Sequence, residues 1–93
     1  MGVAEGIETA LAASRRFGMV VWATTAEGLL QKWQPPAEAR RIIVFGDNDS
    51  NAVGQAAAWA LAKRLFHDAE KNKTKIEVEV RIPEAAGTDW ADQ

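Results

Sequence analysis

The sequence feature that most constrains the fold is the apolar run Ile42-Ile43-Val44-Phe45, which ends at Gly46 and is followed by Asp47 and Asp49. Four consecutive apolar residues predict a central strand that is buried on both faces, because such a strand does not need to alternate apolar and polar residues. The two aspartates then lie just past its carboxyl end, at the edge where open α/β sheets bind ligands. The sequence therefore predicts an acidic site at the mouth of a buried sheet.

The composition narrows the chemistry of that site. The chain contains no cysteine, which excludes disulfides, zinc-thiolate sites and thiol nucleophiles, and His67 is its single histidine. Oxygen ligands remain, and these favour Mg²⁺, Mn²⁺ or Ca²⁺. An EF-hand loop starting at Asp47 is not favoured, because its sixth and twelfth positions are Ala52 and Ala58 instead of glycine and glutamate.

Length and composition predict one small folded domain, with 93 residues of which 47% are apolar and 26% charged. No stretch is apolar for long enough to cross a bilayer and no signal peptide is visible, so we expect a cytoplasmic domain. Because the chain opens on a strand with no lead-in, we also expect residues 1–93 to be a single domain cut from a longer protein.

Strand-like and helix-like segments alternate along the chain. Residues 2–6 resemble the tail end of a strand followed at once by a helix. Further strands are predicted at residues 19–23, 42–45 and 76–82, and helices at residues 7–17, 24–34 and 52–70. This alternation indicates right-handed βαβ units and a mostly parallel sheet. We therefore predict a compact, Rossmann-like α/β domain of about four mostly parallel strands in the order 2-1-3-4, with flanking helices.

Apolar spacing predicts which surfaces are buried. The residues expected to face the sheet are Ile7, Ala10, Leu11 and Ser14 in the first helix, Leu29, Leu30 and Trp33 in the second, and Val53, Ala57, Leu61 and Leu65 in the last. Gly18 predicts a left-handed cap at the end of the first helix. The strand at 19–23 is predicted to be buried, whereas the strict alternation of 76–82 favours a sheet edge.

The strand order brings Glu5 toward Asp47 and Asp49. Glu5 follows the first predicted strand, which in the order 2-1-3-4 lies beside the strand before Asp47. Several carboxylates that lie close together need a cation to compensate their charge. The alternative is that Asp47 and Asp49 belong to an ordinary solvated loop between a strand and a helix.

Four short motifs in this order resemble the Toprim domain. They are Glu5-Gly6-Ile7-Glu8 after the first strand, Asp47-Asn48-Asp49 after the third, a helix beginning with Gly54, and the late segment Gly87 to Asp92. The resemblance spans Val3 to Asp92 and is strongest to the Toprim domains of phage- and plasmid-type primases, which are often joined to a helicase.

The resemblance implies roles for the acidic residues. Glu5 is expected to be the catalytic glutamate, and Asp47 and Asp49 the pair that holds Mg²⁺, with Mn²⁺ as a substitute. Glu8 matches the second acidic position of the first motif, and both Glu5 and Glu8 are expected to be further metal ligands. Gly6 is expected to let a phosphate approach the backbone at a helix start.

The late segment supplies two further acids. Asp89 and Asp92 match the family's third acidic segment and are possible additions to the site; the alternative is a frayed polar tail. If Glu5, Glu8, Asp47, Asp49, Asp89 and Asp92 form one cluster, seven acids remain against eleven Lys and Arg, which is compatible with phosphate contacts.

The implied function is the Mg²⁺-binding catalytic core of a DNA primase, a nucleotidyltransferase that makes RNA primers on single-stranded DNA. Its expected partners are the single-stranded template, ribonucleoside triphosphates and neighbouring primase or helicase domains, without which we expect little or no activity. One alternative is a Toprim-type nuclease or another Mg²⁺-dependent phosphotransfer domain. Another is a non-catalytic module that binds metal or nucleic acid, because a fold alone does not decide a reaction.

Overall fold

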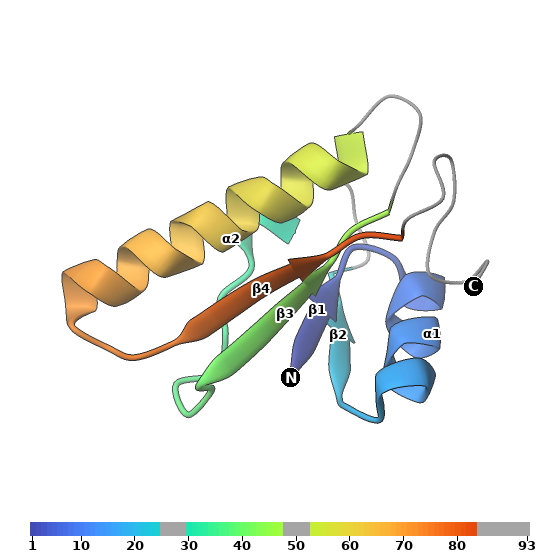
Figure 1. Ribbon diagram of the computed structural model, residues 1–93, viewed down its shortest axis with the longest axis horizontal. Coiled ribbons are helices and arrows are strands. Elements are labelled where there is room, and N and C mark those ends of the chain that lie inside the picture. Colours follow the sequence, from blue (N-terminus) through green and yellow to red (C-terminus); the bar gives the residue numbers. More distant parts are fainter. Residues whose placement is uncertain (25–29, 48–52, 84–93) are drawn as a thin grey trace.

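Strands and helices alternate along the chain as predicted (Figure 1). The structure is a computed structural model that describes residues 1–24, 30–47 and 53–83. Its elements are β1 (Gly2–Ala4), α1 (Ile7–Phe17), β2 (Val21–Ala23), the 3₁₀ turn η1 (Leu30–Lys32), β3 (Arg41–Phe45), α2 (Val53–Asn72) and β4 (Glu77–Arg81). No helix in these described ranges is long and apolar enough to span a membrane.

The four strands form one sheet in the order β2-β1-β3-β4, and every neighbouring pair is parallel. This confirms the predicted α/β fold and strand order. β3 is a central strand, and the side chains of Ile42, Ile43, Val44 and Phe45 are each at most 1% exposed. The apolar run is therefore buried on both faces, as its lack of alternation predicts.

Each face of the sheet carries its own hydrophobic core, because successive side chains of a strand point to opposite faces. The core beneath α2 contains Val3, Leu30, Ile42, Val44, Ala57, Ala58, Leu61 and Leu65. The core beneath α1 contains Ala4, Ala10, Ala13, Ile43 and Phe45. The two helices thus cover opposite faces (Figure 1), and Ala57, Leu61 and Leu65 face the sheet as predicted.

The buried face of α1 differs from the prediction. Ile7 and Leu11 are 57% and 53% exposed, whereas Thr9, Ala10 and Ala13 are buried. Small residues face the sheet because aromatic rings already fill the space there: Phe45 of β3 stacks on Phe17 at the end of α1, with ring centroids 5.4 Å apart. Gly18 caps this helix in the left-handed conformation, with φ 63° and ψ 38°, which confirms that prediction.

The prediction that residues 19–23 form a buried strand was wrong. β2 is an edge strand that pairs with β1 alone, and Trp22 is 48% exposed. At this exposed edge the Trp22 ring packs against the Trp33 ring in an edge-to-face arrangement, with the ring centroids 6.4 Å apart. β4 is the other edge of the sheet, as its alternation predicts.

The predicted second helix is described only in part. Its end is the single 3₁₀ turn η1, closed by a hydrogen bond from Trp33 N to Leu30 O at 3.3 Å, in place of regular α-helix. Leu30 is 2% exposed and belongs to the core beneath α2, as expected of an inward-facing residue. Leu29 and the capping residues at 25–27 lie outside the described residues.

Candidate functional site

Glu5 and Asp47 leave neighbouring strands at the same edge of the sheet. β1 ends at Ala4 and β3 at Phe45, and these two residues are paired in parallel register. Glu5 comes one residue after its strand and Asp47 two residues after its own, and both side chains are half-buried. The structure therefore brings together two acids that are far apart in the sequence, at the edge where parallel sheets bind ligands.

A hydrogen bond ties the start of α1 to Asp47. The hydroxyl of Thr9 donates to Asp47 Oδ1 at 3.3 Å, and Thr9 is 5% exposed. Sequence reasoning missed Thr9 because the expected inward face of this helix was centred on larger apolar residues. The sequence signal for a buried Thr9 was its position directly before Ala10, a residue that was expected to face the sheet.

The main chain around Glu5 is held by the end of the neighbouring strand. Thr24 N donates to Ala4 O at 3.0 Å, and Thr24 Oγ1 donates to Glu5 O at 3.4 Å. Thr24 follows β2 directly, so three consecutive strands of the sheet contribute to this edge. These bonds anchor the backbone from which the Glu5 side chain projects.

Gly6 and Glu8 form the start of α1. Gly6 is the exposed N-cap residue, with φ −97° and ψ 151°, which is extended backbone open to any residue. Among the described residues, the nearest heavy atom to a Cβ placed there is Thr9 Oγ1 at 4.0 Å, so these residues leave the backbone accessible. Glu8 is exposed in the first turn of the helix, where a carboxylate is favoured by the helix dipole.

The remaining acids predicted for the site are not described. Asp49, Asp89 and Asp92 lie outside the described residues. Within residues 1–24, 30–47 and 53–83, no group of three or more His, Cys, Asp or Glu side chains is arranged to hold a metal ion. The described donors at the sheet edge are Glu5 and Asp47, and such a set fits Mg²⁺, which usually takes one or two carboxylates and keeps several waters.

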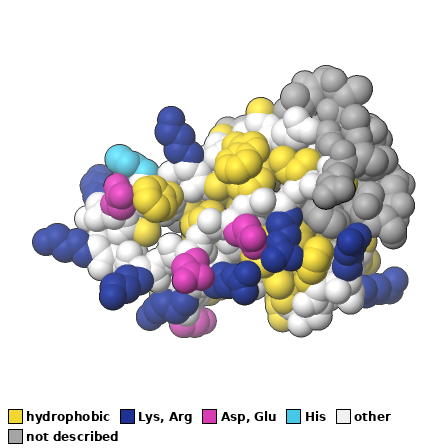
Figure 2. All heavy atoms as spheres, viewed as in Figure 1, with side chains coloured by type: hydrophobic (Ala, Val, Ile, Leu, Met, Phe, Trp, Pro, Cys, Tyr) yellow, Lys and Arg dark blue, Asp and Glu magenta, His cyan; other side chains and the backbone are white. Residues whose placement is uncertain are grey.

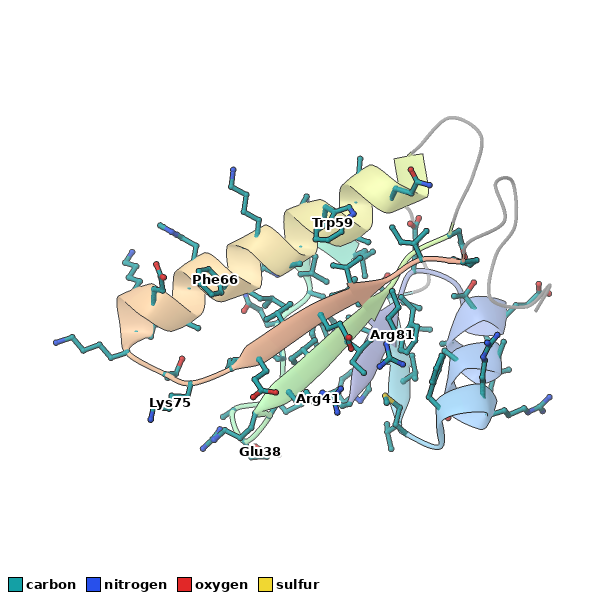
Figure 3. All side chains as sticks on the ribbon, in the orientation of Figure 1. Glu38, Arg41, Trp59, Phe66, Lys75 and Arg81 are labelled. Atoms are coloured by element: carbon teal, nitrogen blue, oxygen red, sulfur yellow. The ribbon has the colours of Figure 1, made fainter. Side chains whose placement is uncertain are left out.

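The main chain at the end of β4 also reaches this edge. Gly46 N donates to Arg81 O at 3.0 Å, which places the end of β4 beside the residue before Asp47. The Arg81 guanidinium turns back over the sheet, where it lies 4.8 Å from the Phe17 ring centroid and donates to Glu79 Oε2 at 3.1 Å. The Arg81 guanidinium therefore packs on the α1 face of the sheet (Figure 3).

A separate apolar groove runs between α2 and β4, and the described residues that line it include no acid. It is lined by Trp59, Ala62, Lys63, Phe66, Val78 and Val80. Trp59 and Phe66 are 59% and 57% exposed, and Figure 3 shows both side chains on α2. Figure 2 shows apolar side chains gathered on this face of the molecule. The groove supplies no metal ligand, so the acidic edge is the candidate metal centre.

The observed arrangement defines a Rossmann-like α/β domain whose two central strands end in acids. A scan against protein-family models matches residues 1–93 to the Toprim domain. The chain belongs to the Toprim family, whose domains bind divalent metal ions, typically Mg²⁺, and occur in primases and nucleases that process nucleic acids. Searches of curated proteins and of solved structures found no match.

Proposed function

We propose that this Toprim domain is the Mg²⁺-binding catalytic core of a DNA primase, which adds ribonucleotides to an RNA primer on single-stranded DNA. The observation that carries the proposal is the placement of Glu5 and Asp47 at the paired ends of β1 and β3. Membership of the Toprim family supports the metal and the nucleic-acid substrate. The order of the acidic motifs in the sequence favours a primase.

The proposed roles follow from position and chemistry. Asp47, together with Asp49, would hold Mg²⁺, and the ion would supply polarisation of the reacting phosphate and charge compensation for the pyrophosphate that leaves. Glu5 is proposed to accept the proton of the attacking hydroxyl, the role of a general base. The hydrogen bond from Thr24 Oγ1 to Glu5 O supports this role by restraining the Glu5 backbone. Gly6 leaves the start of α1 accessible, so that a phosphate can approach its main-chain N–H groups. Glu8, Asp89 and Asp92 are proposed as further acids of the same site.

The proposed partners are a single-stranded DNA template, ribonucleoside triphosphates and neighbouring primase or helicase domains, acting in the cytoplasm. The exposed Trp59 supports a nucleic-acid partner, because bases stack on aromatic side chains. Lys63 lies one helical turn further along α2, lines the same groove and offers a charge for a phosphate.

The first experiment replaces Asp47 and Glu5 in the protein that contains this domain. Asp47→Asn removes the charge that holds Mg²⁺, and we expect primer synthesis to fall by at least about 100-fold, with weaker Mg²⁺ binding. Glu5→Gln removes the base, and we expect a loss of about 10²- to 10⁴-fold in primer synthesis with Mg²⁺ affinity largely retained. Primer synthesis and Mn²⁺ affinity are measured side by side.

The control is Glu38→Gln, because Glu38 is exposed before β3, at the end of the sheet where the strands begin, opposite to the end where Asp47 lies (Figure 3). It changes net charge by the same amount and should leave both measurements unchanged. Normal primer synthesis by Asp47→Asn would overturn the proposal.

A Toprim-type nuclease is the second candidate, since the family includes nucleases as well as primases. The same acids would then hold Mg²⁺ at a phosphodiester that is cleaved. Mg²⁺-dependent cleavage of end-labelled DNA, abolished by Asp47→Asn and without nucleotide incorporation, would favour the nuclease. A domain that binds metal or nucleic acid but performs neither reaction would be the non-catalytic module.

A further inference from the structure

The hydroxyl of Thr9 is an uncommon polar group in the interior of this domain. Thr9 is 5% exposed and is the buried polar residue among the described parts of the chain. Its hydroxyl donates to Asp47 Oδ1 at 3.3 Å across 38 residues of sequence. The bond therefore connects the helix of the first acidic motif with the strand end of the second.

The Thr9 hydroxyl does not donate to the acceptors that a helical threonine commonly uses. A threonine within a helix commonly donates to the main-chain oxygen three or four residues earlier. For Thr9 these acceptors are Gly6 O, which accepts from Ala10 N at 3.0 Å, and Glu5 O, which accepts from Thr24 Oγ1 at 3.4 Å. The Thr9 hydroxyl donates to neither in the described structure; it donates across to Asp47 Oδ1.

The shape of threonine makes this donor well suited to holding a carboxylate. A β-branched side chain in a helix has few χ1 rotamers, so its hydroxyl points in a fixed direction. The small side chains of Ala10 and Ala13 on the same buried face allow α1 to lie close to the sheet. Asp47 is half-buried and lies two residues past the end of β3, so a donor on α1 can bias the orientation of its carboxylate.

We infer that Thr9 is a positioning residue: its hydroxyl fixes the orientation of the Asp47 carboxylate and thereby raises the affinity of the acidic edge for a divalent cation. The second half of this inference rests on the proposed function, in which Asp47 holds Mg²⁺. The first half concerns the side chain alone and can be tested without metal.

The metal-free test compares three variants of the 93-residue chain by NMR. Thr9→Val keeps the β-branched shape and removes the hydroxyl, whereas Thr9→Ser keeps the hydroxyl. Ser14→Ala is the matched control, because Ser14 Oγ, on the same helix, donates to Met19 O at 2.7 Å, away from Asp47. The Hα–Hβ couplings of Asp47 report its χ1 rotamer.

We expect the Asp47 couplings of the wild type to be retained in Thr9→Ser and Ser14→Ala and to change in Thr9→Val. Unchanged couplings in Thr9→Val, with the amide spectrum still that of the folded domain, would overturn the inference. A structural role in packing alone would not produce the difference between valine and serine at this position.

The second test measures Mn²⁺ affinity of the same variants from paramagnetic broadening. We expect Thr9→Val to bind about tenfold more weakly, the lower end of the roughly 10- to 100-fold loss seen when a ligand's hydrogen-bond partner is removed. The lower end applies because 3.3 Å is long for an O–H···O bond. Thr9→Ser should restore wild-type affinity.

The two tests separate the two proposals. Equal Mn²⁺ affinity in the wild type and Thr9→Val would overturn the inference that Thr9 supports metal binding, while leaving the proposed function intact. Absence of broadening near Asp47 in the wild type would count against the proposed function and remove the metal-binding half of the inference. In that case the rotamer measurement alone would decide whether Thr9 positions Asp47.

Discussion

The two faces of the sheet are built from side chains of different size. Beneath α2 the core contains branched residues such as Leu61 and Leu65 from the helix and Ile42 from the sheet. Beneath α1 the helix contributes Ala10 and Ala13, and the large side chains come from elsewhere. The helix on the α2 face therefore buries more apolar surface per turn. The helix on the α1 face buries less, but its small side chains let it lie close to the sheet, which brings the Thr9 hydroxyl to Asp47.

The largest effect should come from the α2 face. Leu61 is fully buried, and Leu61→Ala leaves a cavity, so we expect it to lower the free energy of unfolding by about 2–5 kcal/mol. Leu11→Ala on α1 is the matched control, because Leu11 is 53% exposed and should change stability by less than about 0.5 kcal/mol. Urea unfolding of both variants measures the difference. Similar losses from the two variants would break the contrast between the faces.

A smaller effect is expected where β1 meets the ring of Phe45. A Cβ on Gly2 would lie 2.6 Å from Phe45 Cε2 and 3.1 Å from Val21 Cγ2, so Gly2→Ala forces the ring or the strand to move. We expect a loss of about 1–3 kcal/mol. Gly6→Ala is the control, since its Cβ would meet its nearest heavy atom only at 4.0 Å, and it should cost less than about 1 kcal/mol. Equal stability of the two variants would show that the α1 face is loosely packed.

The smallest effects concern the ends of the two helices. Gly18 after α1 and Lys73 after α2 both adopt positive φ, 63° and 56°. Gly18→Ala should destabilise the domain by about 1 kcal/mol, and Lys73→Gly should stabilise it by up to about 1 kcal/mol, because glycine adopts this conformation without strain. Thermal unfolding of both variants gives the signs. Destabilisation by Lys73→Gly would mean that the lysine side chain contributes more than its backbone strain removes.

Several features of this protein were determined by the sequence alone. The run from Ile42 to Phe45 predicted a doubly buried strand, and the alternation of strands and helices predicted a parallel sheet in the observed order. That order placed Glu5 beside the end of β3, because parallel strands end at a common edge. These predictions succeeded because each depends on local patterning or on a general rule of chain connection.

The tertiary structure decided what depends on neighbours. The predicted order 2-1-3-4 placed residues 19–23 in an edge strand, and their apolar composition predicted burial there. Trp22 is nevertheless 48% exposed, because burial depends on which side chains cover the strand, and these are not encoded within a five-residue segment. The rotation of α1, which exposes Ile7 and Leu11, follows from the space that the Phe17 and Phe45 rings leave beneath the helix. That same rotation turns Thr9 inward. The hydrogen bond from Thr9 to Asp47 could not be predicted from the sequence, because the two residues are 38 positions apart. Periodicity identifies the apolar stripe of a helix and does not indicate polar contacts between different elements.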